Sequence, residues 1–137
     1  MKKFTNLKNK FRKQTNLFGT WTSISSNIVT EILVKTHTDF IGVDVEHSAT
    51  SLEQIQNIII SAQAANISCL PRIATHNNES IKRILDLGAD GIIVPNIDTV
   101  DQINQIVEWM KYPPLGKRGY GIARAQGFGH NFNDYIK

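Results

Sequence analysis

The sequence contains one cysteine, no long apolar run and no acidic residue before position 31. The single cysteine, Cys69, excludes an internal disulfide, which is typical of proteins from a reducing cytoplasm. No apolar run reaches the roughly 18 residues that a membrane span requires, and the chain does not open with a secretory-signal pattern. We therefore expect a cytoplasmic protein without a membrane partner. Its 41% hydrophobic and 20% charged residues are typical of one globular domain.

The lack of acids leaves the N-terminal segment strongly basic. Six of the fifteen basic residues lie there, at Lys2, Lys3, Lys8, Lys10, Arg12 and Lys13. The net charge of +3 therefore belongs to an arm and not to a basic face, which argues against nucleic-acid binding. Phe4, Leu7 and Phe11 recur at helical spacing, so residues 1–16 are expected to form a basic helix or arm that docks on the rest of the chain. Transit peptides and polyanion-binding segments have a similar composition, so both interpretations stay open.

Short apolar runs alternate with helical patterns through the rest of the chain. The runs at residues 17–22, 39–44, 68–73 and 91–95 predict strands, and a segment with apolar residues at helical spacing follows each of them. Ser51 with Gln54, and Thr99 with Gln102, form capping boxes that predict two helix starts. Strands separated in this way must be parallel and joined by right-handed crossovers, so the fold class is α/β.

Chain length restricts the architecture. A doubly wound sheet and a TIM barrel both fit the alternation, but a whole barrel requires roughly 200 residues or more. We interpret residues 17–137 as about half of a (β/α)8 barrel, with four parallel strand–helix units. An open half-barrel leaves strand edges and one apolar sheet face uncovered, so we expect a partner or a missing segment to cover them. Pro71 has no N–H to donate, which predicts a strand end or an irregular pairing at that point.

Reactive side chains follow the second predicted strand. Asp44, Glu46 and His47 lie where the apolar run from Asp39 should end. The carboxyl ends of parallel strands carry the chemistry of α/β enzymes, because the loops there vary while the strands stay packed. We therefore predict a site at this position. The alternative is a solvated strand end whose carboxylates cap the next helix.

Six segments resemble, in order and spacing, the N-terminal half of the HpcH/HpaI aldolase family, which includes 4-hydroxy-2-oxoheptanedioate aldolase and 2-dehydro-3-deoxyglucarate aldolase. They are Gly19-Thr20-Trp21, Asp39 to His47, Pro71-Arg72, and residues 81–89, 91–95 and 112–119. The resemblance implies a TIM-barrel lyase that depends on a divalent metal (Mg, Mn or Co). It also implies that 2-keto-3-deoxy acids are cleaved to pyruvate, or a pyruvate-like product, and an aldehyde, and that the protein is a homo-oligomer.

The resemblance also implies roles for single residues. His47 would be the catalytic base, with Asp44 fixing the tautomer of its ring and strengthening it as a base. Arg72 would bind the 2-keto acid and stabilise the enolate. These roles suit the side chains, because imidazole exchanges protons near neutral pH and guanidinium stays charged with a fork of donors.

The remaining implied roles concern the rim of the site and the metal. Glu46 would lie near the waters of the metal, Asp86 would face the site of a neighbouring subunit, and Arg118 or Arg124 would close over the substrate. Trp21 is a candidate to line the pocket, although an aromatic residue at a strand end belongs to the core or rim as often. The metal ligands of the family lie on later strands, so we expect none in this chain.

Departures from the family pattern, and three alternatives, remain. Ser48 and Ala49 stand where the family has a small residue and then proline, residues 75–77 replace Trp-Asn-Asp, and Asn96 replaces methionine. These changes bear on the substrate more than on the reaction. Arg72 could instead form a structural ion pair with Asp44 or Glu46. The whole chain could instead be a non-catalytic half-barrel that serves as an assembly or binding module, or a polyanion-binding protein.

Overall fold

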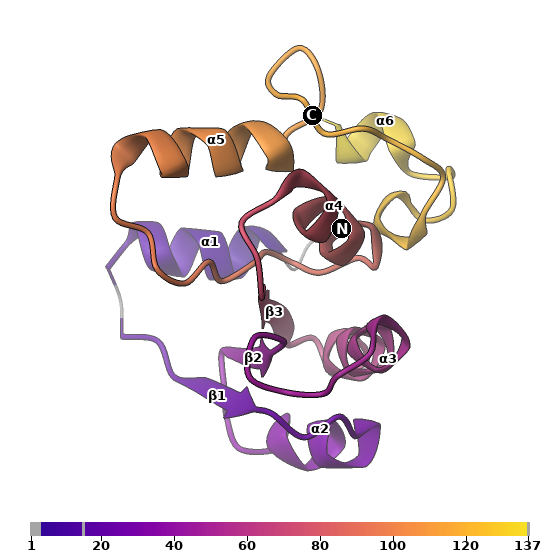
Figure 1. Cartoon of the computed structure of the whole chain (residues 1–137). Helices are drawn as coiled ribbons and strands as arrows, with labels where there is room; N and C mark the ends of the chain where they lie inside the picture. The colour runs from indigo at the N-terminus through magenta and orange to yellow at the C-terminus, as the bar shows by residue number, and fades with distance from the viewer. Residues whose placement is uncertain (1–3, 15, 137) are drawn as a thin grey trace.

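The computed structural model describes residues 4–14 and 16–136, with side chains from residue 7 onward. Lys2, Lys3 and the Phe4 side chain of the predicted basic arm lie outside the described part. The elements, in chain order, are α1 (Phe4–Arg12), β1 (Gly19–Thr22), α2 (Asn27–Leu33), β2 (Phe40–Asp44), α3 (Leu52–Ala64), β3 (Ser68–Arg72), α4 (Asn78–Asp86), α5 (Val100–Met110), the short 3-10 helix η1 (Arg124–Gln126) and α6 (Phe132–Tyr135) (Figure 1). The predicted alternation of strands and helices is confirmed up to β3 and α4.

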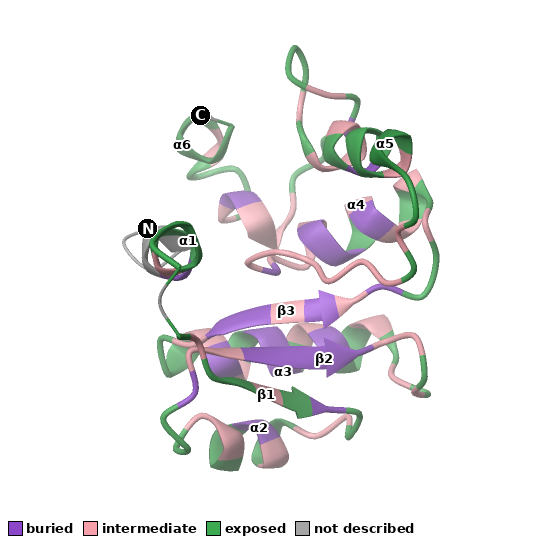
Figure 2. Cartoon of the chain, turned by 90° about the vertical axis from the view of Figure 1, so that its left-hand side faces the viewer, coloured by how far each residue is buried: buried purple, intermediate pink, exposed green. Residues whose placement is uncertain are grey.

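The sheet is parallel, with strand order β1-β2-β3. Trp21 pairs with Gly42, and Asp44 pairs with Arg72. All three arrowheads therefore point to the same edge of the sheet (Figure 2). This parallel α/β arrangement confirms the predicted fold class.

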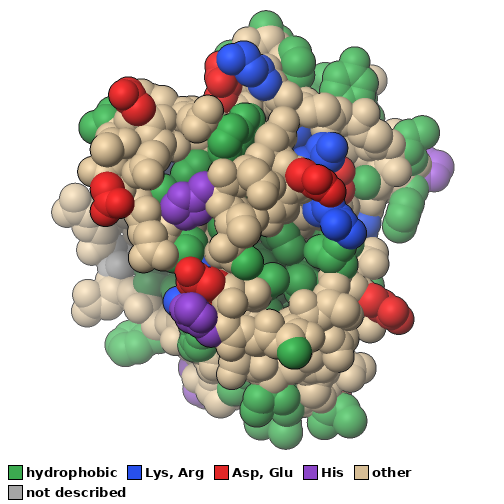
Figure 3. Space-filling model, in the orientation of Figure 1, with side chains coloured by type: hydrophobic (Ala, Val, Ile, Leu, Met, Phe, Trp, Pro, Cys, Tyr) green, Lys and Arg blue, Asp and Glu red, His purple; other side chains and the backbone are tan. Residues whose placement is uncertain are grey.

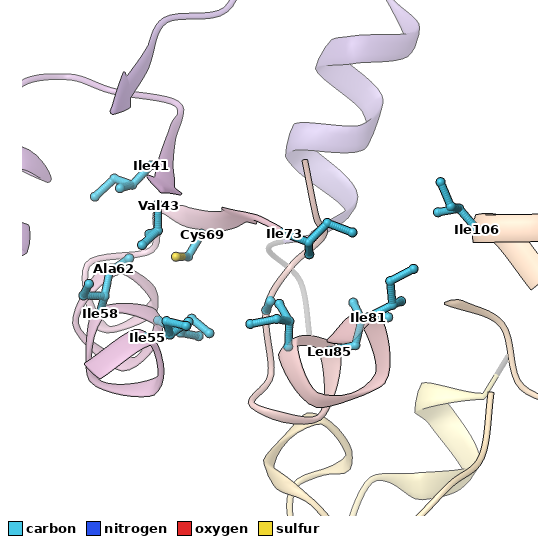
Figure 4. Close-up of a cluster of buried hydrophobic side chains, with 13 residues drawn as sticks. Ile41, Val43, Ile55, Ile58, Ala62, Cys69, Ile73, Ile81, Leu85 and Ile106 are labelled. Atoms are coloured by element: carbon cyan, nitrogen blue, oxygen red, sulfur yellow. The ribbon is translucent and has the colours of Figure 1, made fainter. Parts of the chain in front are cut away.

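The core lies between the sheet and the helices that follow its strands. Alternate strand residues face the helices, because successive side chains point to opposite faces of a sheet. The buried members include Ile41, Val43 and Cys69 from the strands, Ile73 directly after β3, and Ile55, Ile58, Ile59 and Ala62 from α3 (Figure 4). Burying an aliphatic side chain of this kind contributes roughly 1.5–3 kcal/mol.

Both predicted capping boxes are present. The Ser51 hydroxyl accepts the Gln54 N–H at 3.3 Å, and the Gln54 side chain accepts the Ser51 N–H at 2.9 Å. Thr99 and Gln102 make the same reciprocal pair at the start of α5. These pairs satisfy N–H groups that a helix cannot satisfy itself, which is why the short sequence signal locates the helix starts.

The predicted fourth strand, residues 91–95, is not confirmed as a strand. Only Ile93 pairs with β3, in a parallel bridge to Arg72. Its N–H donates to Pro71 O at 2.9 Å, and the Ile73 N–H donates to Ile93 O at 3.0 Å. The next ladder bond toward the start of the strand would need an N–H on Pro71, which proline lacks. Pro71 therefore ends the pairing on that side, and Pro95 has no N–H to continue it on the other.

The N-terminal helix docks at the start of the strands. Leu7 of α1 is buried, the Lys10 ammonium forms an ion pair with Asp39, and the Phe11 and Phe40 ring centroids lie 6.4 Å apart. Asp39 immediately precedes β2, so α1 lies by the amino-terminal edge of the sheet (Figure 2).

Apolar side chains also remain on the surface. Ile28 and Ile32 of α2 are exposed, as are Val100, Ile103 and Val107 of α5. Figure 3 shows apolar side chains gathered over α2, at the bottom of the view. Each set has helical spacing, so each helix presents one apolar face to water. Within the described residues, no helix is long and apolar enough to cross a membrane.

One half-buried carboxyl group links α3, β3 and the segment after α4. Asp90 Oδ2 accepts the Cys69 N–H at 2.7 Å, and Asp90 Oδ1 accepts a hydrogen bond from Gln63 Nε2 at 2.9 Å. Burial raises the pKa of Asp90 to about 6, although the hydrogen bonds from Cys69 and Gln63 and the charge of Arg124 act in the opposite direction.

This raised pKa predicts a pH dependence of stability. The folded chain keeps a proton on Asp90 that the unfolded chain releases, so Asp90 stabilises the fold at about pH 4 and below, and this contribution is lost as the pH rises through about 6. The free energy of unfolding of Asp90→Asn, which has no such proton to lose, should not fall in this way. We therefore expect the stability of the variant relative to the wild type to rise by roughly 1–3 kcal/mol from about pH 4 to pH 7. Urea unfolding at both pH values measures this gain. An equal difference between the two proteins at both pH values would contradict it.

Candidate active site

The site lies where β2 and β3 end. Because these neighbouring strands are parallel and in register, Asp44 and Arg72 face each other across the last position of the ladder. Side chains at paired positions of adjacent strands project from the same face. The Asp44 side chain is 8% exposed and the Arg72 side chain 22% exposed, so the guanidinium still reaches water.

Asp44 and Arg72 form a two-point ion pair. Nε of Arg72 donates to Oδ1 of Asp44 at 3.2 Å, and Nη2 donates to Oδ2 at 2.6 Å. Burial raises the pKa of Asp44, but the hydrogen bonds from Arg72 and from the backbone of the following loop outweigh it and leave the pKa below its ordinary value. The hydrogen bond to Asp44 in turn raises the pKa of Arg72. Both groups are therefore charged at neutral pH.

The loop after β2 is organised around the same carboxylate. Oδ1 of Asp44 accepts the backbone N–H groups of Glu46 and His47, each at 3.0 Å. Oε2 of Glu46 lies 3.3 Å from Nε of Arg72 and 3.7 Å from Nε2 of His47. The His47 side chain is 73% exposed.

These contacts correct one prediction and bear out one alternative. Asp44 holds the main chain of His47 and not its ring, so the predicted orientation of the imidazole by Asp44 is not what the structure shows. The carboxylate nearest the ring is Glu46. The reason is the strand register, which places both Asp44 oxygens against Arg72. The ion pair of Arg72 with Asp44 and Glu46, considered from the sequence, is present.

Trp21 completes the site from β1. Its ring centroid lies 5.1 Å from the central carbon of Arg72, in cation–π geometry. The indole lies over Gly42, where an added Cβ would meet it at 2.5 Å. Glycine is therefore required at position 42 for the indole to reach Arg72. Trp21 is 47% exposed, so it lies at the rim of the site and not in the core.

Arg72 keeps donors for a ligand. A guanidinium has five N–H groups. The Nε–H and one Nη2–H face the carboxylates of Asp44 and Glu46. Among the described residues, the other three N–H groups, two on Nη1 and one on Nη2, have no hydrogen-bond acceptor. A planar group with several free donors suits a carboxylate or a 2-keto acid.

Three other predicted site residues lie elsewhere. Helix α4 starts beyond the carboxyl end of β3 and runs back, so Asp86 at its last position lies toward the amino-terminal edge of the sheet. Arg118 is 2% exposed, and its Nη2 donates to Asp86 Oδ1 at 2.6 Å. Arg124 Nη1 donates to Leu87 O at 3.2 Å, just after α4.

Arg118 and Arg124 are therefore not placed to close over a substrate at Arg72 of the same chain. Arg118 is instead held in an aromatic cage, 4.7 Å from the Tyr112 ring centroid and 5.7 Å from that of Tyr135. The two arginines line separate hollows of about 410 Å³ and 560 Å³. The sequence did not predict these positions, because residue spacing does not show at which edge of the sheet the loop after α5 lies.

The carboxylates of the site do not form a metal site. Both oxygens of Asp44 face the Arg72 guanidinium, and Glu46 contacts the same cation. A divalent cation would have to compete there with a fixed positive charge, so the residues present do not fit one. In the part of the chain that the structure describes, no group of three His, Cys, Asp or Glu side chains is close enough to hold a metal ion.

Two polar features of the structure were not predicted from the sequence. Hydroxyl groups of Ser25, Ser48 and Thr50 form a hydrogen-bonded chain beside Asp44. The position of Ser48 in the reactive stretch was a signal, but nothing distinguishes Ser25 from its serine neighbours. Asp90 was also missed, although an acid directly before an apolar run is a usable sign.

Comparisons with known proteins show the family of the chain. Residues 17–133 match the family model for HpcH/HpaI aldolase/citrate lyase. A hydroxypyruvate/pyruvate aldolase from Roseobacter denitrificans is 35% identical over 127 residues, which are 88% of this chain and 50% of that protein. A 2-keto-3-deoxy-L-rhamnonate aldolase from Escherichia coli is 30% identical over 124 residues, 89% of this chain and 46% of that protein.

A solved structure extends the likeness to the fold. A protein of the HpcH/HpaI aldolase/citrate lyase family from Burkholderia cenocepacia superposes with a TM-score of 0.89 at 28% identity. The superposition covers 96% of this chain and 54% of that one. The chain therefore spans about half the length of the curated relatives it matches.

The ion pair of the site predicts a strong energetic coupling. In a double-mutant cycle of Asp44→Asn and Arg72→Gln, we expect a coupling energy of roughly 1–3 kcal/mol in the free energy of unfolding, because removing either partner leaves a poorly solvated charge. The exposed pair Lys117 and Glu108, 3.0 Å apart, is the matched control and should give less than about 1 kcal/mol.

Acid should remove the coupling. Since the folded-state pKa of Asp44 is lowered, its contribution is present above the unfolded value near 3.8 and is lost as the pH falls through the folded value. Urea unfolding of the four proteins at neutral and acid pH measures this. A coupling no larger than that of the control pair would show that the two-point geometry adds no stability.

Proposed function

Because the chain belongs to the HpcH/HpaI aldolase/citrate lyase family, we propose that it forms the N-terminal half of a carbon–carbon lyase. The reaction is the cleavage of a 2-keto-3-deoxy acid to pyruvate, or a pyruvate-like product, and an aldehyde. One observation carries the proposal: a guanidinium fixed by two carboxylates keeps three free N–H groups beside an exposed imidazole, at the carboxyl edge of a parallel sheet.

Arg72 binds the keto acid and stabilises the charge that develops on it. Its free N–H groups donate to the carboxylate and the 2-keto oxygen of the substrate. Cleavage of the bond between C3 and C4 leaves an electron pair that becomes an enolate, with negative charge on the 2-keto oxygen. A fixed donor at that oxygen stabilises the enolate more than the ground state and so lowers the barrier. Asp44 fixes the donor in place.

His47 acts as the base. It takes the proton from the C4 hydroxyl group as the C3–C4 bond breaks, which releases the aldehyde, and C3 of the enolate is then protonated to give pyruvate. Its exposed ring, within 4 Å of Glu46, can accept and release the proton. Trp21 forms an apolar wall of the pocket next to Arg72.

The residues of this chain would not supply the ligands of the metal that the family uses, and the rest of the complete protein would. The carboxylates of Asp44 and Glu46 both contact Arg72, so neither suits a divalent ion. A divalent ion (Mg, Mn or Co) would supply Lewis-acid stabilisation of the keto acid when bound. We propose that its ligands lie outside residues 1–137.

The architecture follows from the same proposal. Residues 17–137 would supply four strand–helix units of a TIM barrel, with the Ile93 segment becoming a full strand once a neighbour pairs with it, and residues 1–16 would cap the barrel. The protein would act in the cytoplasm as a homo-oligomer. Asp86 would then face the site of a neighbouring subunit, because it lies toward the edge of the sheet opposite Arg72 in its own chain.

A second candidate function is a non-catalytic assembly module. The exposed apolar faces of α2 and α5 favour it, since large exposed apolar patches mark interaction surfaces. This candidate predicts no release of pyruvate under any metal condition, so an activity assay separates the two.

Removing the base or the guanidinium should abolish activity of the complete protein. We expect His47→Ala and Arg72→Ala each to lower kcat/KM for pyruvate release by about 100-fold or more, because each removes a group that acts on the transition state. His130→Ala, in an exposed loop, is the matched control and should retain wild-type activity. A lactate dehydrogenase-coupled assay measures pyruvate. Wild-type rates in both site variants would refute the proposal.

The purified 137-residue chain should bind no divalent metal tightly. We expect isothermal titration with Mg, Mn or Co to show no binding at micromolar strength, because Arg72 occupies the carboxylates of the site. Micromolar binding that is lost in Glu46→Gln would place a metal ligand in this chain and contradict the expectation.

A further inference from the structure

Three hydroxyl groups connect two loops at the carboxyl edge of the sheet. Ser25, in the loop between β1 and α2, lies with its Oγ 2.7 Å from Thr50 Oγ1. Thr50 Oγ1 lies 2.7 Å from Ser48 Oγ, and Ser48 Oγ donates to the main-chain carbonyl oxygen of Asp44. All three side chains are half-buried, so bulk water does not freely replace their partners.

The direction of the protons in this chain follows from counting donors. Each hydroxyl group has one proton to donate. The proton of Ser48 is committed to Asp44 O, so Thr50 must donate to Ser48. The proton of Thr50 is then committed as well, so Ser25 must donate to Thr50. Each hydroxyl group therefore donates to the next one toward Asp44. Ser48 is the last donor, and its acceptor is the main-chain oxygen of Asp44.

The segment that the chain closes is the one that carries Glu46 and His47. The Asp44 side chain accepts the N–H groups of both residues, and the Ser48 side chain returns to the Asp44 carbonyl. Residues 44–48 therefore form a ring closed by side-chain bonds at both ends. The hydroxyl groups of Thr50 and Ser25 link this ring to the neighbouring loop, and the Thr50 N–H also donates to Ser48 Oγ at 3.3 Å.

We infer that Ser48, Thr50 and Ser25 are positioning residues that hold the loop of His47 and Glu46 at a fixed place relative to Arg72. The inference rests on the proposed function, in which His47 is the base. Arg72 is fixed by its strand and by Asp44, whereas His47 lies on a loop without regular structure. The Val45 N–H donates to Arg72 O at 3.1 Å and so ties the start of the loop to β3. Beyond Val45, the distance of His47 from the substrate on Arg72 depends on the bonds that close the loop.

The order of the chain predicts graded effects on the loop. Ser48→Ala removes the bond to Asp44 and leaves both the Thr50 hydroxyl proton and the Thr50 N–H without their acceptor. Thr50→Val breaks the link between the loops, and Ser25→Ala removes only the outermost donor. In the 137-residue chain, we expect amide hydrogen exchange at Glu46 and His47 to rise about tenfold in Ser48→Ala, less in Thr50→Val and least in Ser25→Ala. Thr50→Ser, which keeps the hydroxyl group, should restore wild-type exchange.

Two controls separate positioning from general stability. Thr36→Ala removes an exposed hydroxyl group that donates to the Leu33 carbonyl oxygen at 2.7 Å and should leave Glu46 and His47 unchanged. The Ile59 amide, in the core helix α3, reports global opening and should not change in any variant. Unchanged exchange at Glu46 and His47 in Ser48→Ala, or an equal rise at Ile59, would overturn the inference.

Kinetics of the complete protein give the second readout. We expect Ser48→Ala to lower kcat about tenfold with KM nearly unchanged, because Arg72 still binds the keto acid while the base is misplaced. A rise in KM alone would contradict the positioning role. Full activity in His47→Ala would instead refute the proposed base, and it would leave the exchange result standing, so the two failures are distinguishable.

Discussion

The ion pair between Asp44 and Arg72 is the interaction on which the site depends. It exists because β2 and β3 are parallel and in register, so their last residues face each other. The carboxylate uses both oxygens on the guanidinium and one of them also on two main-chain N–H groups. A single side chain therefore fixes the cation that binds the proposed substrate and the start of the loop that carries the proposed base.

The two edges of the sheet have different chemistry. The carboxyl edge holds a partly exposed guanidinium with unused donors, an exposed imidazole and an indole, which together can receive a ligand. The opposite edge holds an arginine that is buried, paired with Asp86 and enclosed by two tyrosines. Arg118 therefore stabilises the packing of the late loop on α4 within its own chain. Only a neighbouring subunit could turn that edge into part of a catalytic site.

Local signals predicted the fold well wherever the physics is local. The capping boxes of Ser51 and Thr99 located two helix starts because their bonds lie within four residues. The prediction of a fourth strand failed because its pairing depends on a proline in the neighbouring strand. The position of Arg118 could not be predicted, because it depends on the path of a long loop that no sequence pattern specifies. Asp44, Glu46 and His47 were predicted as a site from their place after a strand, and Arg72 from the family resemblance. The strand register, and not the motif, decided that Asp44 pairs with Arg72 and leaves the ring of His47 to Glu46.

The most direct measurement is a titration of the isotope-labelled chain with pyruvate, followed by NMR at the side-chain N–H groups of its arginines and at the backbone amides of Glu46 and His47. We expect saturable shifts at Arg72 and at both amides, while Arg118 and Arg124 remain unchanged. Shifts confined to Arg118 and Arg124, or the absence of a saturable shift at Arg72, would contradict the assignment of the keto acid to the Asp44–Arg72 edge.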